Sequence, residues 1–437
     1  MEKIKKLIAK VNSNTLIKQS IITLILRVFG VITLFGFTLF LTHNYSPKIV
    51  GQYDFTRTFL LLVGSIALLG TDQSVLFFAG KLRALNSFSV LKKLYINNLK
   101  ILFMTSLCLL LLFLLVDKNF VDSFFNDSST YNIIYKCVFL LFFNVLTLYN
   151  TEFIRALGDV YLSELFRNTF KYFPVFIGSI LLTFQGNPEC LIDFFIYGFF
   201  FLAIITLIII LIKLVKIEGE HLDFCNEVNQ VKIIKSSYSM GISSLIFFLL
   251  LSVDVFLLKR YFGDAVVAYY SLAIKLMTFM SMVIISFGIN ASTKIAELYE
   301  LKKVEELTVV IKRSNKLIFI INFIGGVILI LFSETILKIF GADYILADSA
   351  LRLLVLSQII ASFFGVIPLY MNMTNKQVVF KRIMFLALFI NIILNIFLIP
   401  RYEMLGAAFS YSISNVFWVL LCVIYVYNRD KIKVSVF

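Results

Sequence analysis

Long apolar stretches separated by short polar ones make up most of the chain. The stretch IITLILRVFGVITLFGFTLFL, residues 21–41, can cross a bilayer, because about 20 residues at 1.5 Å rise span the roughly 30 Å hydrocarbon core. Runs of this kind, ending at charges or turn residues, predict twelve transmembrane helices. The predicted spans are 20–42, 51–79, 99–116, 132–153, 168–185, 191–212, 237–260, 266–292, 315–334, 350–372, 379–399 and 405–427.

Composition places the chain among membrane proteins. Hydrophobic residues make up 60% of it and charged residues only 15%, whereas soluble globular domains are about 45–50% apolar and about 25% charged. Together with the helix-length runs, this predicts an all-α polytopic membrane protein.

The net charge is +14, and the distribution of the basic residues fits membrane topology rather than a nucleic-acid-binding surface. If the N-terminus is cytoplasmic, inner segments hold 29 Lys and Arg residues and outer segments hold eight. This asymmetry is the positive-inside rule. It predicts a multi-pass protein of the plasma membrane with both termini in the cytoplasm, and no nucleic-acid partner.

Two longer hydrophilic stretches organise the chain. Residues 216–236 connect a predicted N-terminal lobe of six helices, 1–215, to a C-terminal lobe of six, 237–437. Residues 294–316 mix Leu and Val with Glu and Lys, which predicts a helix lying on the inner membrane surface.

A weak internal repeat relates the two halves. YSPKIVGQY, residues 45–53, aligns without a gap to FGDAVVAYY, residues 262–270. Because six helices restore the chain's orientation, the two lobes would be related by a parallel pseudo-two-fold axis along the membrane normal.

Motifs of soluble catalysis are missing from the sequence. It contains no GxxxxGK[ST] phosphate-binding loop, and His43 and His221 occur outside any HExxH or CxxC motif. The five cysteines are scattered, mostly within apolar runs. We therefore expect neither a metal site nor an enzyme.

Three cations interrupt the predicted helices. Arg27, Arg57 and Lys275 lie on the first, second and eighth spans, each within a stripe of small or polar residues at helical spacing. A charge at mid-membrane costs at least about 2.5–3.5 kcal/mol, so such residues face a bundle interior or a water-filled cavity. Carboxylates that could act as charge partners or in coupling are Asp54, Asp72 and Asp254.

Two interpretations of these cations are open. Each could be half of a structural salt bridge, with Asp254 as the partner of Lys275 across a short loop. Alternatively, the three line one solvated cavity, because Asp54 and Asp254 would neutralise two of them and leave Arg27 without an evident anion. A cationic cavity of this kind would suit a phosphorylated substrate.

The C-terminal region resembles a transporter superfamily. LNIFLIPRYEMLGAAFSYSISN, residues 394–415, is similar to the pattern LN-x-x-L-I-P-x-x-G-x-x-G-A-A of polysaccharide transporters in the multidrug/oligosaccharidyl-lipid/polysaccharide (MOP) exporter superfamily. Glu403 stands where that pattern has its first glycine. The likeness is greatest to Wzx-type flippases of O-antigen and related glycans, and the twelve-helix plan covers the whole chain.

The resemblance implies a function in surface-glycan and lipopolysaccharide biosynthesis. It implies two six-helix lobes that open alternately to either side of the bacterial inner membrane, and transport of undecaprenyl-diphosphate-linked oligosaccharide to the outer leaflet. In the related lipid II flippases, arginines on helices one and two and a cation on helix eight line the central cavity. By helix and depth these match Arg27, Arg57 and Lys275, which are thereby expected to bind the substrate diphosphate.

Cofactors, partners and alternative functions follow from the same resemblance. No cofactor is expected, while proton or sodium coupling stays open. Expected partners are the lipid-linked oligosaccharide, membrane lipids, a polysaccharide polymerase and a chain-length regulator. A multidrug or organic-cation exporter shares the architecture but would favour acidic or aromatic cavity walls. A membrane glycan polymerase or ligase would need a sizeable external loop, and the largest one predicted, near 117–131, is short.

Overall fold

The computed structural model describes residues 15–84, 90–215, 230–374 and 376–432. All of its regular elements are helices, and no strand occurs within these ranges. The α-helices are, in chain order, α2 (Thr15–Asn44), α3 (Pro47–Leu68), α4 (Thr71–Ala84), α5 (Leu91–Leu114), α6 (Lys118–Phe125), α7 (Thr130–Phe139), α8 (Leu141–Ala156), α9 (Val160–Asn168), α10 (Phe173–Gln185), α11 (Leu191–Val215), α12 (Gln230–Phe262), α13 (Asp264–Glu300), α14 (Val304–Leu331), α15 (Ser333–Phe340), α16 (Asp348–Ser362), α17 (Ile367–Met373) and α18 (Gln377–Asp430).

Every predicted span is helical, but several are broken. Among the described residues, seven helices are long and apolar enough to cross a membrane, or up to nine if each of two bent pairs counts as one span. The predicted span 51–79 is α3 and α4, bent by 48°, and the span 132–153 is α7 and α8, bent by 52°. The expected number of twelve is therefore not reproduced by helix length and composition.

The break between α3 and α4 has a local cause. Leu69 and Gly70 adopt positive φ angles of 49° and 79°. A Cβ on Gly70 would lie 2.4 Å from the carbonyl oxygen of Ser237 and 2.5 Å from the backbone nitrogen of Gly241, both in α12. Gly70 thus permits both the turn and the close approach of α12.

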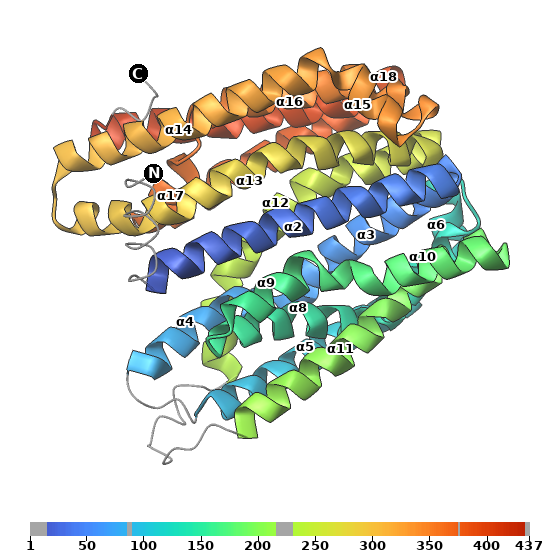
Figure 1. Cartoon of the computed structure of the whole chain (residues 1–437), viewed down its shortest axis with the longest axis horizontal. Helices are drawn as coiled ribbons and strands as arrows, with labels where there is room; N and C mark the ends of the chain where they lie inside the picture. Colours follow the sequence, from blue (N-terminus) through green and yellow to red (C-terminus); the bar gives the residue numbers. More distant parts are fainter. Residues whose placement is uncertain (1–14, 85–89, 216–229, 375, 433–437) are drawn as a thin grey trace, which may run out of the picture. The chain divides into compact units, whose positions relative to one another are not determined.

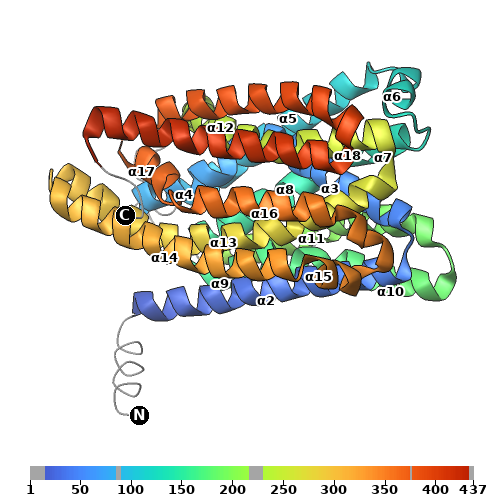
Figure 2. The ribbon, with the colours of Figure 1, turned by 90° about the horizontal axis from the view of Figure 1, so that it is seen from above.

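The chain forms two compact units, and neither unit is one continuous stretch of the sequence. Unit 1 comprises residues 1–44, 63–117 and 132–241, and unit 2 comprises 45–62, 118–131 and 242–437. In unit 1, α8 packs against α4, α5, α9 and α11. In unit 2, α13, α14 and α16 pack against one another, as both views show (Figures 1 and 2). The division into lobes at 216–236 stays a prediction, because compact units reflect proximity and not repeats.

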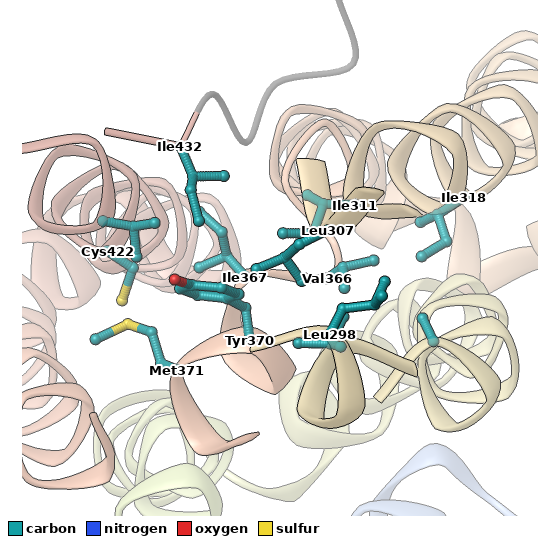
Figure 3. Packing of buried hydrophobic residues seen from close by; sticks show 13 residues of the cluster. Leu298, Leu307, Ile311, Ile318, Val366, Ile367, Tyr370, Met371, Cys422 and Ile432 are labelled. Carbon is teal, nitrogen blue, oxygen red and sulfur yellow. The ribbon is translucent and has the colours of Figure 1, made fainter. Parts of the chain in front are cut away.

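The predicted surface helix at 294–316 is wrong. These residues form the end of α13 and the start of α14, joined at Leu301–Lys303. Ile295, Leu298, Leu307 and Ile311 are buried in a cluster around Tyr370 of α17 (Figure 3). The apolar residues of the segment are therefore covered by neighbouring helices and not by the membrane surface.

Helix α18 consists of two arms that meet at Glu403. The backbone of Glu403 has a φ of 49° and a ψ of −129°, which are not helical. Glycine adopts this combination of backbone angles more readily than other residues. Phe380 of the first arm contacts Trp418 of the second, with ring centroids 6.0 Å apart. A Cβ on Gly406 would lie 2.3 Å from the carbonyl oxygen of Leu398. The turn confirms the separate spans 379–399 and 405–427 and explains both glycines of the pattern.

Replacing Glu403 with glycine is expected to stabilise the protein by about 1 kcal/mol. A non-glycine residue in this conformation costs about 1–3 kcal/mol, and the greater freedom of glycine in the unfolded chain offsets about 0.4–1 kcal/mol of the gain. Thermal unfolding in detergent measures the change. The control Glu403→Ala keeps the backbone strain and should bring little gain, so equal stabilisation by alanine would contradict this explanation.

Candidate functional site

Arg27 in unit 1 has a carboxylate partner that the sequence interpretation missed. Its Nη2 lies 3.0 Å from Oε1 of Glu164, and its Nε donates to Oε2 at 3.2 Å. Helix α2 packs closely on α9, where a Cβ on Gly30 would lie only 2.4 Å from the Cβ of Asn168. The expectation that Arg27 lacks an anion is therefore wrong.

Glu164 serves more than one cation. It also accepts a hydrogen bond from Nη2 of Arg155, and its Oε2 accepts one from Nδ2 of Asn168 at 2.8 Å. Two arginines and an amide thus surround one carboxylate whose side chain is buried. These hydrogen bonds satisfy the buried charge of Glu164. Removing the Glu164 carboxylate would take this partner away from the guanidinium groups of Arg27 and Arg155.

A second carboxylate extends this network. Glu152 forms an ion pair with Arg167, and its Oε2 lies 3.9 Å from Nη1 of Arg155. Asp72, in the first turn of α4, interacts electrostatically with Arg167. We call Arg27, Arg155, Arg167, Glu152 and Glu164 the arginine network. Its guanidinium groups are largely neutralised yet partly accessible, with 25% of the Arg27 side chain exposed.

In unit 2, Lys275 pairs with Asp54. The Lys275 Nζ lies 2.7 Å from Oδ1 and 2.9 Å from Oδ2 of Asp54, and the two side chains are 3% and 1% exposed. Arg57 lies one turn along α3, with its Nε 3.6 Å from Asp54 Oδ1. The structure thus brings Arg57 and Lys275 together around one carboxylate.

Asp254, the predicted partner of Lys275, has other neighbours. Its Oδ2 accepts a hydrogen bond from the Tyr270 hydroxyl at 2.8 Å, and its Oδ1 accepts one from Asn395 Nδ2 at 2.6 Å. Asn391 Oδ1 lies 3.0 Å from the same amide nitrogen. No Lys or Arg of the described ranges forms an ion pair with this fully buried carboxylate. The predicted pairing is wrong because Asp54, far away in sequence, packs closer to Lys275.

A further ion cluster lies beside the link between α6 and α7. The buried Lys259 Nζ is 3.1 Å from Asp127 Oδ2 and also contacts Asp264. Burial raises the pKa of Asp127, but hydrogen bonds from Thr130 and Ser129 and the Lys259 ammonium outweigh it, so the pKa falls below its ordinary value. The cluster joins the end of α12 to the start of α13 and to this link.

The comparisons with known proteins concern the fold. Residues 240–397 match the MatE family model. An inward-facing multidrug resistance MATE family transporter of the MOP superfamily has a TM-score of 0.69 at 12% identity, over 95% of this chain and 98% of that one. The lipid II flippase MurJ, in an inward closed conformation, has a TM-score of 0.69 at 15% identity, over 94% of this chain and 87% of that one.

The fold is that of MOP-superfamily transporters. A further MOP-superfamily transporter, from Pyrococcus furiosus, is described as having a binding pocket of reverse polarity. It has a TM-score of 0.62 at 12% identity, over 95% of this chain and 94% of that one. No curated protein matches the sequence. At these low identities the similarity concerns the fold alone.

Proposed function

We propose that this MOP-type protein is a flippase that moves undecaprenyl-diphosphate-linked oligosaccharide from the cytoplasmic to the outer leaflet of the bacterial inner membrane. The observation that supports this most is the arginine network, which holds three guanidinium groups on helices α2, α8 and α9 of unit 1. Guanidinium groups bind phosphate oxygens through two parallel hydrogen bonds. An organic cation would be repelled by the same groups.

The carboxylates of the network suggest how the empty protein tolerates its arginines. Glu164 occupies two donors of Arg27 in the way that a phosphate would. We propose that the substrate diphosphate replaces Glu164 at Arg27 while Arg155 and Asn168 keep the displaced carboxylate satisfied. Exchange of one anion for another avoids leaving an unpaired charge in the membrane.

Unit 2, taken by itself, also contains cations that could bind an anion. Arg57 is the more accessible cation there, with 23% of its side chain exposed, while Lys275 is enclosed with Asp54. We therefore propose that Arg57 contacts a phosphate directly. Lys275 would contact it only after Asp54 moves away. A membrane potential that is negative inside would favour outward passage of the substrate by about 2.3 kcal/mol per charge per 100 mV.

Asp254 is the proposed coupling residue. It is a buried carboxylate among hydroxyl and amide groups, and Nδ2 of Asn391 and Oδ1 of Asn395 have no hydrogen-bond partner within the described ranges. A proton or a sodium ion could neutralise the carboxylate, and the Oδ1 of Asn395 could serve as a further ligand of sodium. Such binding would power return of the empty protein.

Replacing Asp254 with asparagine is expected to abolish the response of transport to sodium and proton gradients. Transport into vesicles is measured with each gradient imposed separately. The control Asp193→Asn alters a half-exposed carboxylate that pairs with Lys136 and should leave the response intact. An unchanged response in Asp254→Asn would assign coupling to another group.

The topology is part of the same proposal, because 29 inner and eight outer basic residues favour cytoplasmic termini. Reporter fusions at residue 437 and within 216–235 are expected to be cytoplasmic, and a fusion near residue 124 external. An external signal from either of the first two would refute the proposed orientation.

Deleting the gene tests the proposed substrate. Lipid-linked oligosaccharide should accumulate on the cytoplasmic leaflet, and surface glycan should be lost until the gene is restored. A polysaccharide polymerase and a chain-length regulator are proposed as partners that act on the flipped product. Normal surface glycan without a second flippase would reject the proposal, and increased sensitivity to cationic drugs alone would instead favour a multidrug exporter.

A further inference from the structure

An apolar groove runs along the first arm of α18 in unit 2. It lies between α12 and α18 and has a volume of about 600 Å³, within the usual range of about 300–1,000 Å³ for ligand pockets. Its apolar lining residues are Ile242, Ile246, Val378, Phe385, Leu386 and Phe389.

The groove borders a buried cluster on one side and has an exposed wall. Ile246 lines the groove and also belongs to a buried cluster with Leu250, Met384 and Leu388 of the two helices. In contrast, Phe385 of the wall is 64% exposed. Exposed aromatic surface beside a buried cluster is suited to an apolar chain lying in the groove.

Two cations also line the groove. Lys381 and Arg382 lie one helical turn after Val378 and one turn before Phe385. Phe389 follows Arg382 by seven positions, which places the two about 10 Å apart along the helix axis. No described carboxylate forms an ion pair with Arg382. The groove thus combines apolar residues with two cations near the start of α18.

A neighbouring side of the same arm has a similar arrangement. A second groove of about 620 Å³ lies between the two arms of α18, lined by Val379, Ile383, Leu421 and Ile424 and ending at Arg429. Basic residues therefore gather where α18 begins and ends, on two sides of its first arm. By the proposed topology, this is the level of the cytoplasmic head groups.

We infer that the groove between α12 and α18 binds one anionic phospholipid. Its acyl chain lies along Phe385 and Phe389, and its phosphate contacts Lys381 and Arg382. Basic pockets between membrane helices at the cytoplasmic side select anionic head groups. Apolar residues beside two cations match the acyl chain and the phosphate of a membrane phospholipid. The inference does not depend on the transported substrate.

Lipid retention by the full-length protein tests the site. The protein is purified in mild detergent, incubated with phosphatidylglycerol or phosphatidylcholine, and weighed intact by mass spectrometry. We expect one tightly retained phosphatidylglycerol and no comparable phosphatidylcholine. Lys381→Gln with Arg382→Gln should weaken retention about 25-fold, since each basic residue near the head group contributes about fivefold.

The chain offers a matched control. Lys312→Gln with Arg313→Gln changes the same adjacent pair of residue types on α14, away from the groove lining, and should leave retention unchanged. Leu386→Trp keeps every charge but fills the groove, so it should also weaken retention. Thermal unfolding confirms that each variant is folded.

Three outcomes would overturn the inference. The first is equal loss of phosphatidylglycerol in the control pair, which would make the effect one of overall charge. The second is phosphatidylcholine retained as tightly as phosphatidylglycerol, which would make the groove non-selective. The third is displacement of phosphatidylglycerol from the wild type by equimolar undecaprenyl phosphate, which would assign the groove to the substrate tail.

Discussion

Asp54→Asn is expected to lower the free energy of unfolding by about 3–5 kcal/mol, the typical cost of stranding a buried charge. The substitution changes the size of the side chain little but removes the carboxylate that lies 2.7 Å from the Lys275 ammonium. With 3% of its side chain exposed, Lys275 has little access to water as a substitute. Chemical or thermal unfolding in detergent measures the loss.

Replacing Lys275 should lower the free energy of unfolding less than replacing Asp54. After Lys275→Met, Asp54 retains Arg57, whose Nε is 3.6 Å from its Oδ1. The double variant Asp54→Asn/Lys275→Met should recover most of the loss, because no lysine is then stranded. Glu297→Gln is the matched control, since it breaks the exposed Lys294–Glu297 pair at 3.0 Å, which is worth at most about 1 kcal/mol. Equal losses at Asp54 and Glu297 would contradict a buried pair.

The sequence predicted helices better than it predicted their breaks. The stretches that apolar length picked out are helical, because membrane thickness imposes a minimum length on any spanning helix, but the number of twelve spans is not reproduced. Apolar length did not predict that span 51–79 breaks at Leu69 and Gly70, where the backbone of Gly241 packs against Gly70. Glu403 is different: the missing glycine of the resembling pattern marks the position where the backbone has a positive φ.

The ion pairs were mostly beyond prediction from sequence. Arg27 and Glu164 are 137 residues apart and Asp54 and Lys275 are 221 apart, and hydropathy contains no information on which charges meet. The pairing of Glu164 was also hard to predict because of its neighbours in the sequence. Arg155, Arg167 and Glu164 made residues 155–171 resemble a cytoplasmic loop, whereas the structure places them in or beside α9. The two arginines and two glutamates within residues 152–167 were the available signal.

Arg27→Ala is expected to abolish transport with a stability loss below about 1 kcal/mol. Glu164 keeps Arg155 and Asn168 as hydrogen-bond donors after the change, so no carboxylate is stranded. Loss of transport follows if Arg27 must bind the diphosphate. Surface-glycan output per folded molecule and thermal stability in detergent are measured together. Arg352→Ala, which alters a half-exposed arginine paired with Asp348, is the control and should affect neither quantity.

Arg27→Lys then separates charge from geometry. Arg27 contacts both oxygens of Glu164 through Nε and Nη2, a fork that a lysine ammonium cannot reproduce. We therefore expect Arg27→Lys to transport little better than Arg27→Ala, although it keeps the charge. A structural role predicts the opposite pattern, with stability reduced by about 3–5 kcal/mol and transport per folded molecule preserved. Near-normal transport by Arg27→Ala would exclude Arg27 from phosphate binding, because the exchange of Glu164 for a diphosphate at its guanidinium group could no longer take place.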